Sequence, residues 1–222
     1  MYRPSLALLL LLLLAGTTVQ AQPWVGKDLS SRPCTGKGQG FGPYDYTDPS
    51  SRKRSAKAGG SIPIQVVEQH HFGSHIEKLA GKPKRLAYDI DYTLRAFPNH
   101  HRALHAMARL FLKTADQQEP VWQTPPECYF QRAIAFRKRD AVVHMLFGIY
   151  LQKKGETARA DKEYGLATKL SPTYAEAHYN YGLFLLGIGE YERAREQARL
   201  AYRYGYPLQG LKKKLAKAGH PL

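Results

Sequence analysis

Two histidine triplets are the residues of this 222-residue chain whose types and spacing could do chemistry. Both have the pattern H-H-x-x-x-H, at residues 70–75 and 100–105. On a helix, His101 and His105 would share one face, and imidazoles placed in this way can bind zinc or copper. Neither triplet contains Asp, Glu or Cys, and Gly73 weakens a helix in the first. A histidine metal site therefore stays an alternative, and the favoured prediction has no metal and no cofactor.

Motifs of the common catalytic classes are missing from the sequence. It contains no G-x-S-x-G, no H-E-x-x-H and no phosphate-binding P-loop. Its acidic residues are spread along the chain, and Glu156 and Glu190 recur at predicted helix starts, where negative charge suits the helix dipole. We therefore predict that the protein is not an enzyme.

The first 21 residues have the order of a secretory signal peptide. Arg3 supplies a positive charge, residues 6–15 are an unbroken apolar run, and Val19-Gln20-Ala21 offers small residues before a cut after Ala21. The run is shorter than the roughly 20 apolar residues of a spanning helix. We predict a periplasmic or secreted protein whose mature chain has no transmembrane segment.

The predicted compartment guides the interpretation of the charge and of the cysteines. The chain has 33 Lys and Arg against 18 Asp and Glu, which favours anionic partners such as acidic proteins or anionic envelope surfaces. Export makes nucleic acid an improbable partner, and we predict none. Cys34 and Cys128 are the two cysteines, and an oxidising compartment favours a disulfide between them, with two unpaired thiols as the alternative.

Composition divides the rest of the chain into an arm and a helical body. Residues 22–60 predict a disordered basic arm, because 16 of its 39 residues are Gly, Pro or Ser. The aromatic stretch 41–46 follows Cys34 closely, so a disulfide could hold it on the body. Residues 61–99 are predicted to begin with an extended lead-in, because 62–67 are rich in β-branched residues around Pro63. An incomplete helical unit is predicted to follow, with helices at 74–80 and 83–96.

An internal repeat is the strongest feature of the body. A shift of 34 residues places 141–174 on 175–208, and a period of this length is typical of a stacked helical solenoid. Glycine at 148 and 182 lets paired helices approach closely, and glycine at 155 and 189 suits a left-handed turn. The positions that are identical in both units begin with Ala141, His144, Gly148, Leu151 and Gly155, and continue with Glu156, Arg159, Ala160, Leu166 and Ala167.

These residues resemble the tetratricopeptide-repeat (TPR) family. The first unit matches its pattern at Phe147-Gly148, Leu151, Ala160, Tyr164, Ala167 and Pro172, and the second at Tyr181-Gly182, Leu185, Ala194 and Ala201. His144 and His178 stand where tryptophan is usual, and Ala198 replaces an aromatic residue. The resemblance implies an all-α solenoid: a degenerate repeat with a loop insertion at 100–140, repeats at 141–174 and 175–207, and a basic capping helix at 208–222. Exported TPR adaptors of this kind resemble bacterial envelope proteins.

The resemblance also implies a function and a site. Such proteins are scaffolds or adaptors that bind a protein or peptide in a concave groove lined by the first helix of each repeat. Because the basic part of this groove suits an acidic segment, we expect the partner to carry one. The register assigns the groove to Arg102, His105, Arg109, Lys113, Met145, Ile149, Gln152, Tyr179, Asn180 and Leu183.

The basic C-terminal region supports an alternative function. Residues 193–222 contain eight Lys or Arg and a single acid, Glu196. Much of this charge serves the solubility of a terminal helix. The alternative is an envelope-associated protein that binds anionic lipid or polymer through this region, and such binding would weaken with salt.

Overall fold

The structure, a computed structural model, describes residues 23–38, 40–115, 122 and 124–222. The predicted signal peptide and part of the predicted loop insertion lie outside these residues. No helix of the described ranges is long and apolar enough to cross a membrane. The short 3₁₀-helices are η1 (Pro49–Arg52) and η2 (Ala56–Ala58). The α-helices are α1 (Pro63–His71), α2 (Ser74–Glu77), α3 (Pro83–Ala96), α4 (His101–Lys113), α5 (Pro126–Phe136), α6 (Ala141–Lys153), α7 (Thr157–Leu170), α8 (Ala175–Gly187), α9 (Tyr191–Arg203) and α10 (Gly210–Lys217).

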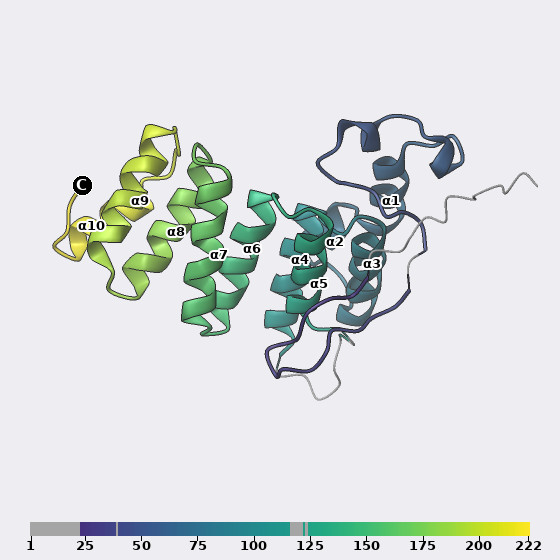
Figure 1. Cartoon of the computed structure of the whole chain (residues 1–222), viewed down its shortest axis with the longest axis horizontal. Helices are drawn as coiled ribbons and strands as arrows, with labels where there is room; N and C mark the ends of the chain where they lie inside the picture. Colours follow the sequence, from purple (N-terminus) through teal and green to yellow (C-terminus); the bar gives the residue numbers. More distant parts are fainter. Residues whose placement is uncertain (1–22, 39, 116–121, 123) are drawn as a thin grey trace, which may run out of the picture.

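Consecutive helical hairpins form the body of the molecule. Helix α4 pairs with α5, α6 with α7 and α8 with α9, and Figure 1 shows these hairpins side by side along the long axis. We call the first helix of each hairpin its A helix and the second its B helix. The A helices α4, α6 and α8 contact one another in order. The predicted all-α hairpin solenoid is confirmed.

The recurring small residues of the repeat lie where the hairpins are tightest. A Cβ atom added to Gly148 would lie 3.0 Å from the ring of Tyr164, so a larger residue would push α6 and α7 apart. The turns of the two hairpins place Gly155 and Gly189 at φ 76° and 81°, a region that favours glycine. The sequence repeat therefore marks helix packing.

A continuous apolar core runs from α2 to α10. It contains the buried faces of every hairpin, and Leu211 and Leu215 of α10 close it at the C-terminal end with no exposed surface. The lysines of α10 are exposed. The polar outer face predicted for the capping helix is thus present, because the end of a solenoid must separate its core from water.

The predicted extended lead-in differs from the structure, which has helix α1 there. Pro63 occupies the first turn of α1, where its missing N–H costs nothing and its fixed φ suits the helix. Ile64 and Val67 turn their side chains into a small second core with Tyr44 and Phe97. The β-branched residues thus serve burial in a helix.

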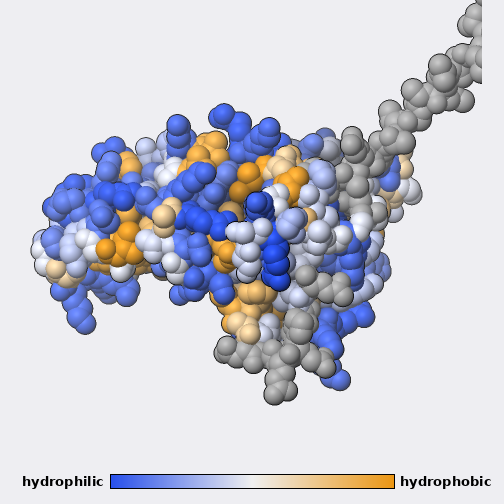
Figure 2. Space-filling view, turned by 60° about the horizontal axis from the view of Figure 1, so that its bottom comes forward, coloured by the Kyte–Doolittle hydropathy of each residue, from blue (hydrophilic) through white to orange (hydrophobic). Residues whose placement is uncertain are grey.

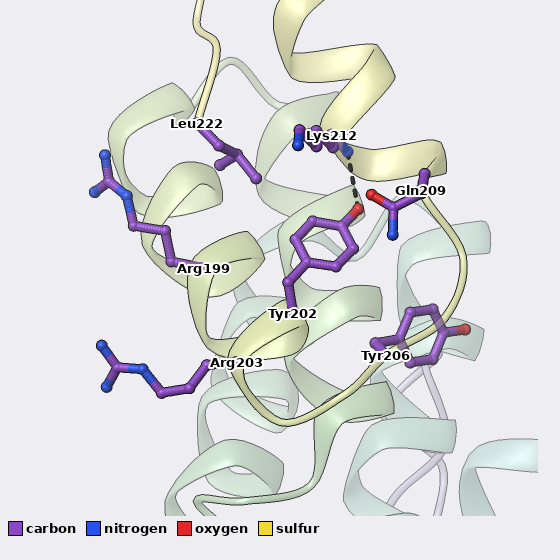
Figure 3. A pocket seen from close by; sticks show the side chains of 7 residues that line it. All are labelled: Arg199, Tyr202, Arg203, Tyr206, Gln209, Lys212 and Leu222. Carbon is purple, nitrogen blue, oxygen red and sulfur yellow. Dashed lines mark hydrogen bonds between the residues drawn. The ribbon is translucent and has the colours of Figure 1, made fainter.

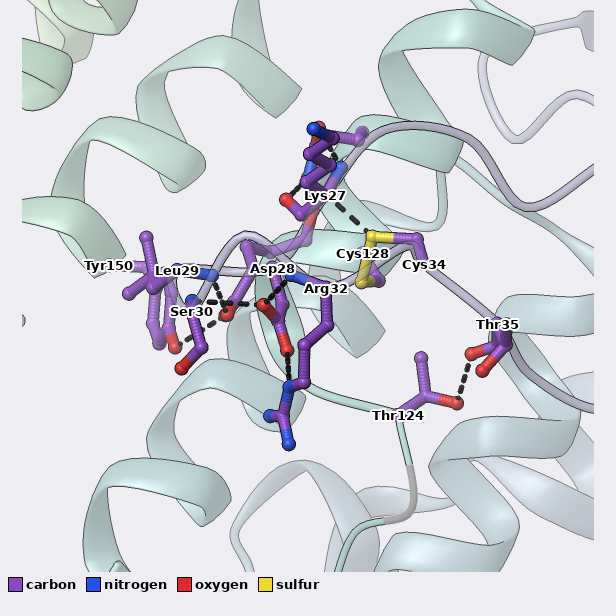
Figure 4. The surroundings of a disulfide bond; sticks show 12 residues. Lys27, Asp28, Leu29, Ser30, Arg32, Cys34, Thr35, Thr124, Cys128 and Tyr150 are labelled. Carbon is purple, nitrogen blue, oxygen red and sulfur yellow. Dashed lines mark hydrogen bonds and ion pairs between the residues drawn. A yellow bond between two sulfur atoms is a disulfide. The ribbon is translucent and has the colours of Figure 1, made fainter.

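The arm from residue 23 to 60 also differs from the expected disorder, because its described residues pack on the body. Cys34 forms a disulfide with Cys128 of α5, which confirms the predicted pair (Figure 4). Beside the disulfide, the Leu29 N–H donates to a Glu127 carboxylate oxygen at 2.8 Å, and the Thr124 hydroxyl donates to the Thr35 carbonyl at 2.8 Å. The first half of the arm is therefore attached to α5 and the segment before it.

Polar contacts hold the second half of the arm. Asn99, which has no exposed surface, donates to Asp45 at 2.8 Å and accepts from the Tyr46 N–H at 3.0 Å. Arg137 pairs with the same Asp45 carboxylate at 2.8 Å. Composition predicts disorder here because the arm has few apolar residues. Its described residues are nevertheless held by a disulfide, by hydrogen bonds to distant residues and by a few apolar side chains such as Trp24 and Tyr44.

Candidate partner-binding face

The A-helix face is the surface of α4, α6 and α8 that carries the ten predicted groove residues. These helices contact one another in order, so residues of different hairpins lie on one surface. The Asn180 amide of α8 lies 3.7 Å from the Met145 sulfur of α6. His105 of α4 lies within electrostatic range of Glu176 of α8. Met145 and Asn180, two predicted residues from neighbouring hairpins, therefore lie side by side.

The α4 end of this face is basic, but part of its charge is already used. Arg102 forms ion pairs with Glu77 of α2 and Glu68 of α1, and these pairs raise the pKa of Arg102. The Arg109 guanidinium donates to the Glu77 carbonyl at 3.4 Å and is otherwise exposed, as is Lys113. Arg109 and Lys113 are thus better placed than Arg102 to receive an acidic partner.

His105 adds little positive charge at neutral pH. Desolvation by the surrounding protein is the largest influence that lowers the pKa of His105, and the neighbouring charge of Arg109 lowers it further. Its side chain still contacts solvent. A mostly neutral imidazole on this face can donate or accept a hydrogen bond.

The middle and far end of the face are apolar and aromatic. Ile149, Asn180 and Leu183 are half-buried, and Gln152 is exposed and accepts a hydrogen bond from the Tyr164 hydroxyl at 2.8 Å. Met145 is only 2% exposed, and the ring of Tyr179, 8% exposed, stacks on Tyr206 at 4.1 Å between centroids. Met145 and Tyr179 therefore support the face from below and offer little surface to a partner.

Three of the six triplet histidines contact carboxylates from other parts of the chain. His71 lies 2.9 Å from Asp89, His100 lies 3.1 Å from Glu68, and His101 lies 2.9 Å from Asp140. His100 also caps α4 by accepting from the Ala103 N–H, and its burial lowers the pKa of its imidazole. Among the described residues, no group of three or more His, Cys, Asp or Glu side chains could hold a metal ion. Three of the six histidines in the two patterns therefore pair with carboxylates.

Two further histidines have a structural role that the sequence analysis missed. His178 lies 2.7 Å from the Gln197 side chain of α9 and 2.8 Å from the Pro172 carbonyl in the preceding turn. His144 makes the equivalent contacts one repeat earlier, at 2.7 Å to Glu163 and 3.4 Å to the Lys138 carbonyl. The recurrence of histidine at 144 and 178 was the available signal, because the partners at 163 and 197 are Glu and Gln. These histidines link α6 to α7 and α8 to α9, and each of them also contacts the turn before its own helix.

We expect His178→Ala to lower the free energy of unfolding by about 2 kcal/mol, because it leaves the Gln197 side chain and the Pro172 carbonyl without their buried partner. Urea unfolding followed by circular dichroism measures the change. His70→Ala is the matched control, since His70 is exposed. Equal stability of the two variants would contradict the structural role of His178.

Comparison with known proteins finds a repeat family within these hairpins. Residues 164–196, which run from α7 into α9, match the family model described as tetratricopeptide repeat. An uncharacterized protein of Haemophilus influenzae is 29% identical over 103 residues, 46% of this chain, and the chain spans 56% of the length of that relative. The crystal structure of MamA is similar over 78% of this chain and 99% of its own, with 19% identity and a TM-score of 0.43. Since the family match falls inside hairpins that repeat every 34 residues, the chain is a TPR repeat protein.

Proposed function

We propose that this protein is a non-catalytic, exported scaffold or adaptor that binds an extended or helical peptide segment of a protein partner across its A-helix face. The observation that carries the proposal is the continuity of this face, because α4, α6 and α8 contact one another in order. Proteins built from stacked hairpins use such continuous surfaces to bind other chains. The disulfide between Cys34 and Cys128 supports export, since disulfides persist in oxidising compartments.

The charge pattern of the face sets the chemistry of the partner. Arg109 and Lys113 give a basic end, and Ile149 and Leu183 offer half-buried apolar surface beyond it. A peptide with acidic residues at one end and apolar residues at the other would meet complementary groups on both. We therefore propose an acidic and apolar segment as the bound element.

The probe is a peptide from an array of peptides with acidic and apolar segments. Fluorescence anisotropy measures the affinity of the protein for this peptide. We expect Arg109→Glu/Lys113→Glu to weaken binding at least tenfold, because two attractive charges become repulsive. The control is Lys162→Glu/Lys169→Glu, which makes the same charge change on the B helix α7. Ile149→Asp should also weaken binding. If the control weakens binding as much as the α4 variant, or if no array peptide binds, the proposed face is wrong.

A further inference from the structure

A hollow of about 380 Å³ lies at the C-terminal end of the solenoid, between the last turn of α9, the following linker and the start of α10. Figure 3 shows the two tyrosine rings and the Lys212 and Gln209 side chains on one side, with the two arginine side chains extending outward on the other. We call this feature the C-terminal hollow. Its lining consists of Arg199, Tyr202, Arg203, Tyr206, Gln209, Lys212 and Leu222.

The aromatic wall of the hollow is held in place from behind. The Tyr202 hydroxyl accepts from the backbone N–H of Lys212 at 3.0 Å and donates to the Leu208 carbonyl at 3.3 Å. The ring of Tyr206 stacks on Tyr179 of α8. The tyrosines are therefore fixed, while the exposed cations around them are long side chains that can move toward a ligand.

Positive charge dominates this end of the molecule. Arg193 and Arg195 are paired with Asp161 and Glu192, but the described residues provide no ion pair for the other cations of α9 and α10. No carboxylate side chain lines the hollow. By contrast, a second hollow of about 510 Å³ between the arm and α5 to α7 includes Glu163. The cations left for an external anion are Arg199, Arg203, Lys212, Lys213, Lys214 and Lys217.

Exposed apolar side chains accompany this charge. Among the described residues, five large hydrophobic side chains are exposed, and three of them belong to this end: Leu208 at 58%, Tyr204 at 37% and Leu222 at 37%. Leu222 lines the hollow, and Leu208 lies in the linker between Tyr206 and Gln209. Figure 2 shows hydrophobic patches within the largely hydrophilic surface of this end. Exposed apolar side chains and unpaired cations therefore occur together at this end.

From this combination we propose that the C-terminal hollow and the residues around it bind the surface of an anionic phospholipid bilayer. Lys and Arg attract the lipid phosphates, tyrosine prefers the level of the head groups, and exposed leucines can enter the boundary with the acyl chains. A second copy of this chain is a poor occupant, because it would bring six more cations against the first six. The proposal does not depend on the A-helix face.

Vesicle flotation with the full-length protein tests the proposal. We expect binding to vesicles that contain phosphatidylglycerol, no binding to pure phosphatidylcholine, and a marked loss between about 0.05 M and about 0.5 M NaCl. Arg199→Gln/Arg203→Gln/Lys212→Gln should weaken vesicle binding at least tenfold. The matched control, Lys153→Gln/Lys162→Gln/Lys169→Gln, removes as many positive charges from α6 and α7 and should bind like the parent protein.

Additional measurements distinguish a bilayer from other anionic ligands, and the C-terminal hollow from the A-helix face. Leu208→Ser should weaken vesicle binding while leaving the charge unchanged, and Arg109→Glu/Lys113→Glu should leave it intact. Inorganic phosphate at millimolar concentration should not compete, because the vesicle offers many head groups and an apolar boundary. The proposal is overturned if anionic vesicles are not bound, if both triple variants weaken binding equally, or if a polyglutamate peptide is bound while the vesicles are not. Circular dichroism melting confirms that each variant is folded.

Discussion

Replacing Cys34 and Cys128 by serine is expected to lower the free energy of unfolding by about 4 kcal/mol, the largest loss that we expect from any change in the chain. The two cysteines are 94 residues apart, so the disulfide removes much of the freedom of the unfolded chain. It also holds the first half of the arm on α5. Urea unfolding of the oxidised protein and of the double variant measures the difference.

The double variant should loosen the two halves of the arm unequally. Residues 23–38 depend on the disulfide, a few hydrogen bonds and the packing of Trp24 and Leu29 on the main core. Residues 43–58 keep Asn99, Arg137 and the small core around Tyr44. Amide hydrogen exchange should therefore rise over 23–38 and change little over 43–58. Reduction of the parent protein with dithiothreitol is the control, because it opens the disulfide without a substitution. Equal stability of the oxidised and reduced proteins would contradict this role.

The repeat could be predicted from the sequence because its causes are local. Gly148 and Gly155 act within one hairpin, and helix boundaries such as Pro83–Ala96 follow from a proline at the first turn and an apolar face. The same local pattern recurs after 34 residues, which gives each prediction an internal check. The solenoid thus follows from short-range spacing.

The arm could not be predicted because its contacts are long-range. Leu29 binds Glu127 across 98 residues, and Asn99 binds Asp45 across 54. Asp and Asn residues of this kind look like ordinary turn residues in the sequence, and a low apolar content predicts disorder. Only the cysteine pair indicated that the arm is attached, and the disulfide is present.

The sequence could predict which site residues lie on the A helices, but not which of their side chains are exposed. The family pattern placed ten residues on the A helices, yet it could not show that Met145 and Tyr179 are buried below the face. It also could not show that Arg102 is paired with Glu77, because that pairing depends on how the short helix α2 packs on α4. The tertiary structure therefore decides which charged side chains of the groove are available to a partner.

Asp140→Ala is expected to lower the free energy of unfolding at neutral pH by about 3 kcal/mol, because it breaks a buried charged network. The Asp140 carboxylate lies 2.9 Å from His101, accepts from Asn99 at 3.1 Å and caps α6 by accepting from the Val143 N–H at 3.3 Å. Its loss would leave His101 and the start of α6 without their partner. Urea unfolding at pH 7 measures the effect.

The same residue predicts how stability depends on pH. Burial tends to raise the pKa of Asp140, but the hydrogen bonds and charge of His101, with the bonds from Asn99 and Val143, outweigh it and lower the pKa in the folded protein. The stabilisation is therefore complete above the unfolded pKa of about 4 and is lost as the pH falls through the lower folded value. The gap between the parent protein and Asp140→Ala should narrow in that acidic range.

A matched variant separates the charge of Asp140 from its shape. Asp140→Asn retains the size of the side chain and an oxygen that can cap α6, so its loss at pH 7 should be smaller than that of Asp140→Ala. Its stability should also depend less on pH below about 4, because the titrating carboxyl is gone. If the gap between the parent protein and Asp140→Ala stays the same from neutral to acidic pH, the carboxylate is not the group that holds α4 and α6 together. In that case the shape of the side chain, and not its ionisation, would account for the stability of the junction among the arm, α4 and α6.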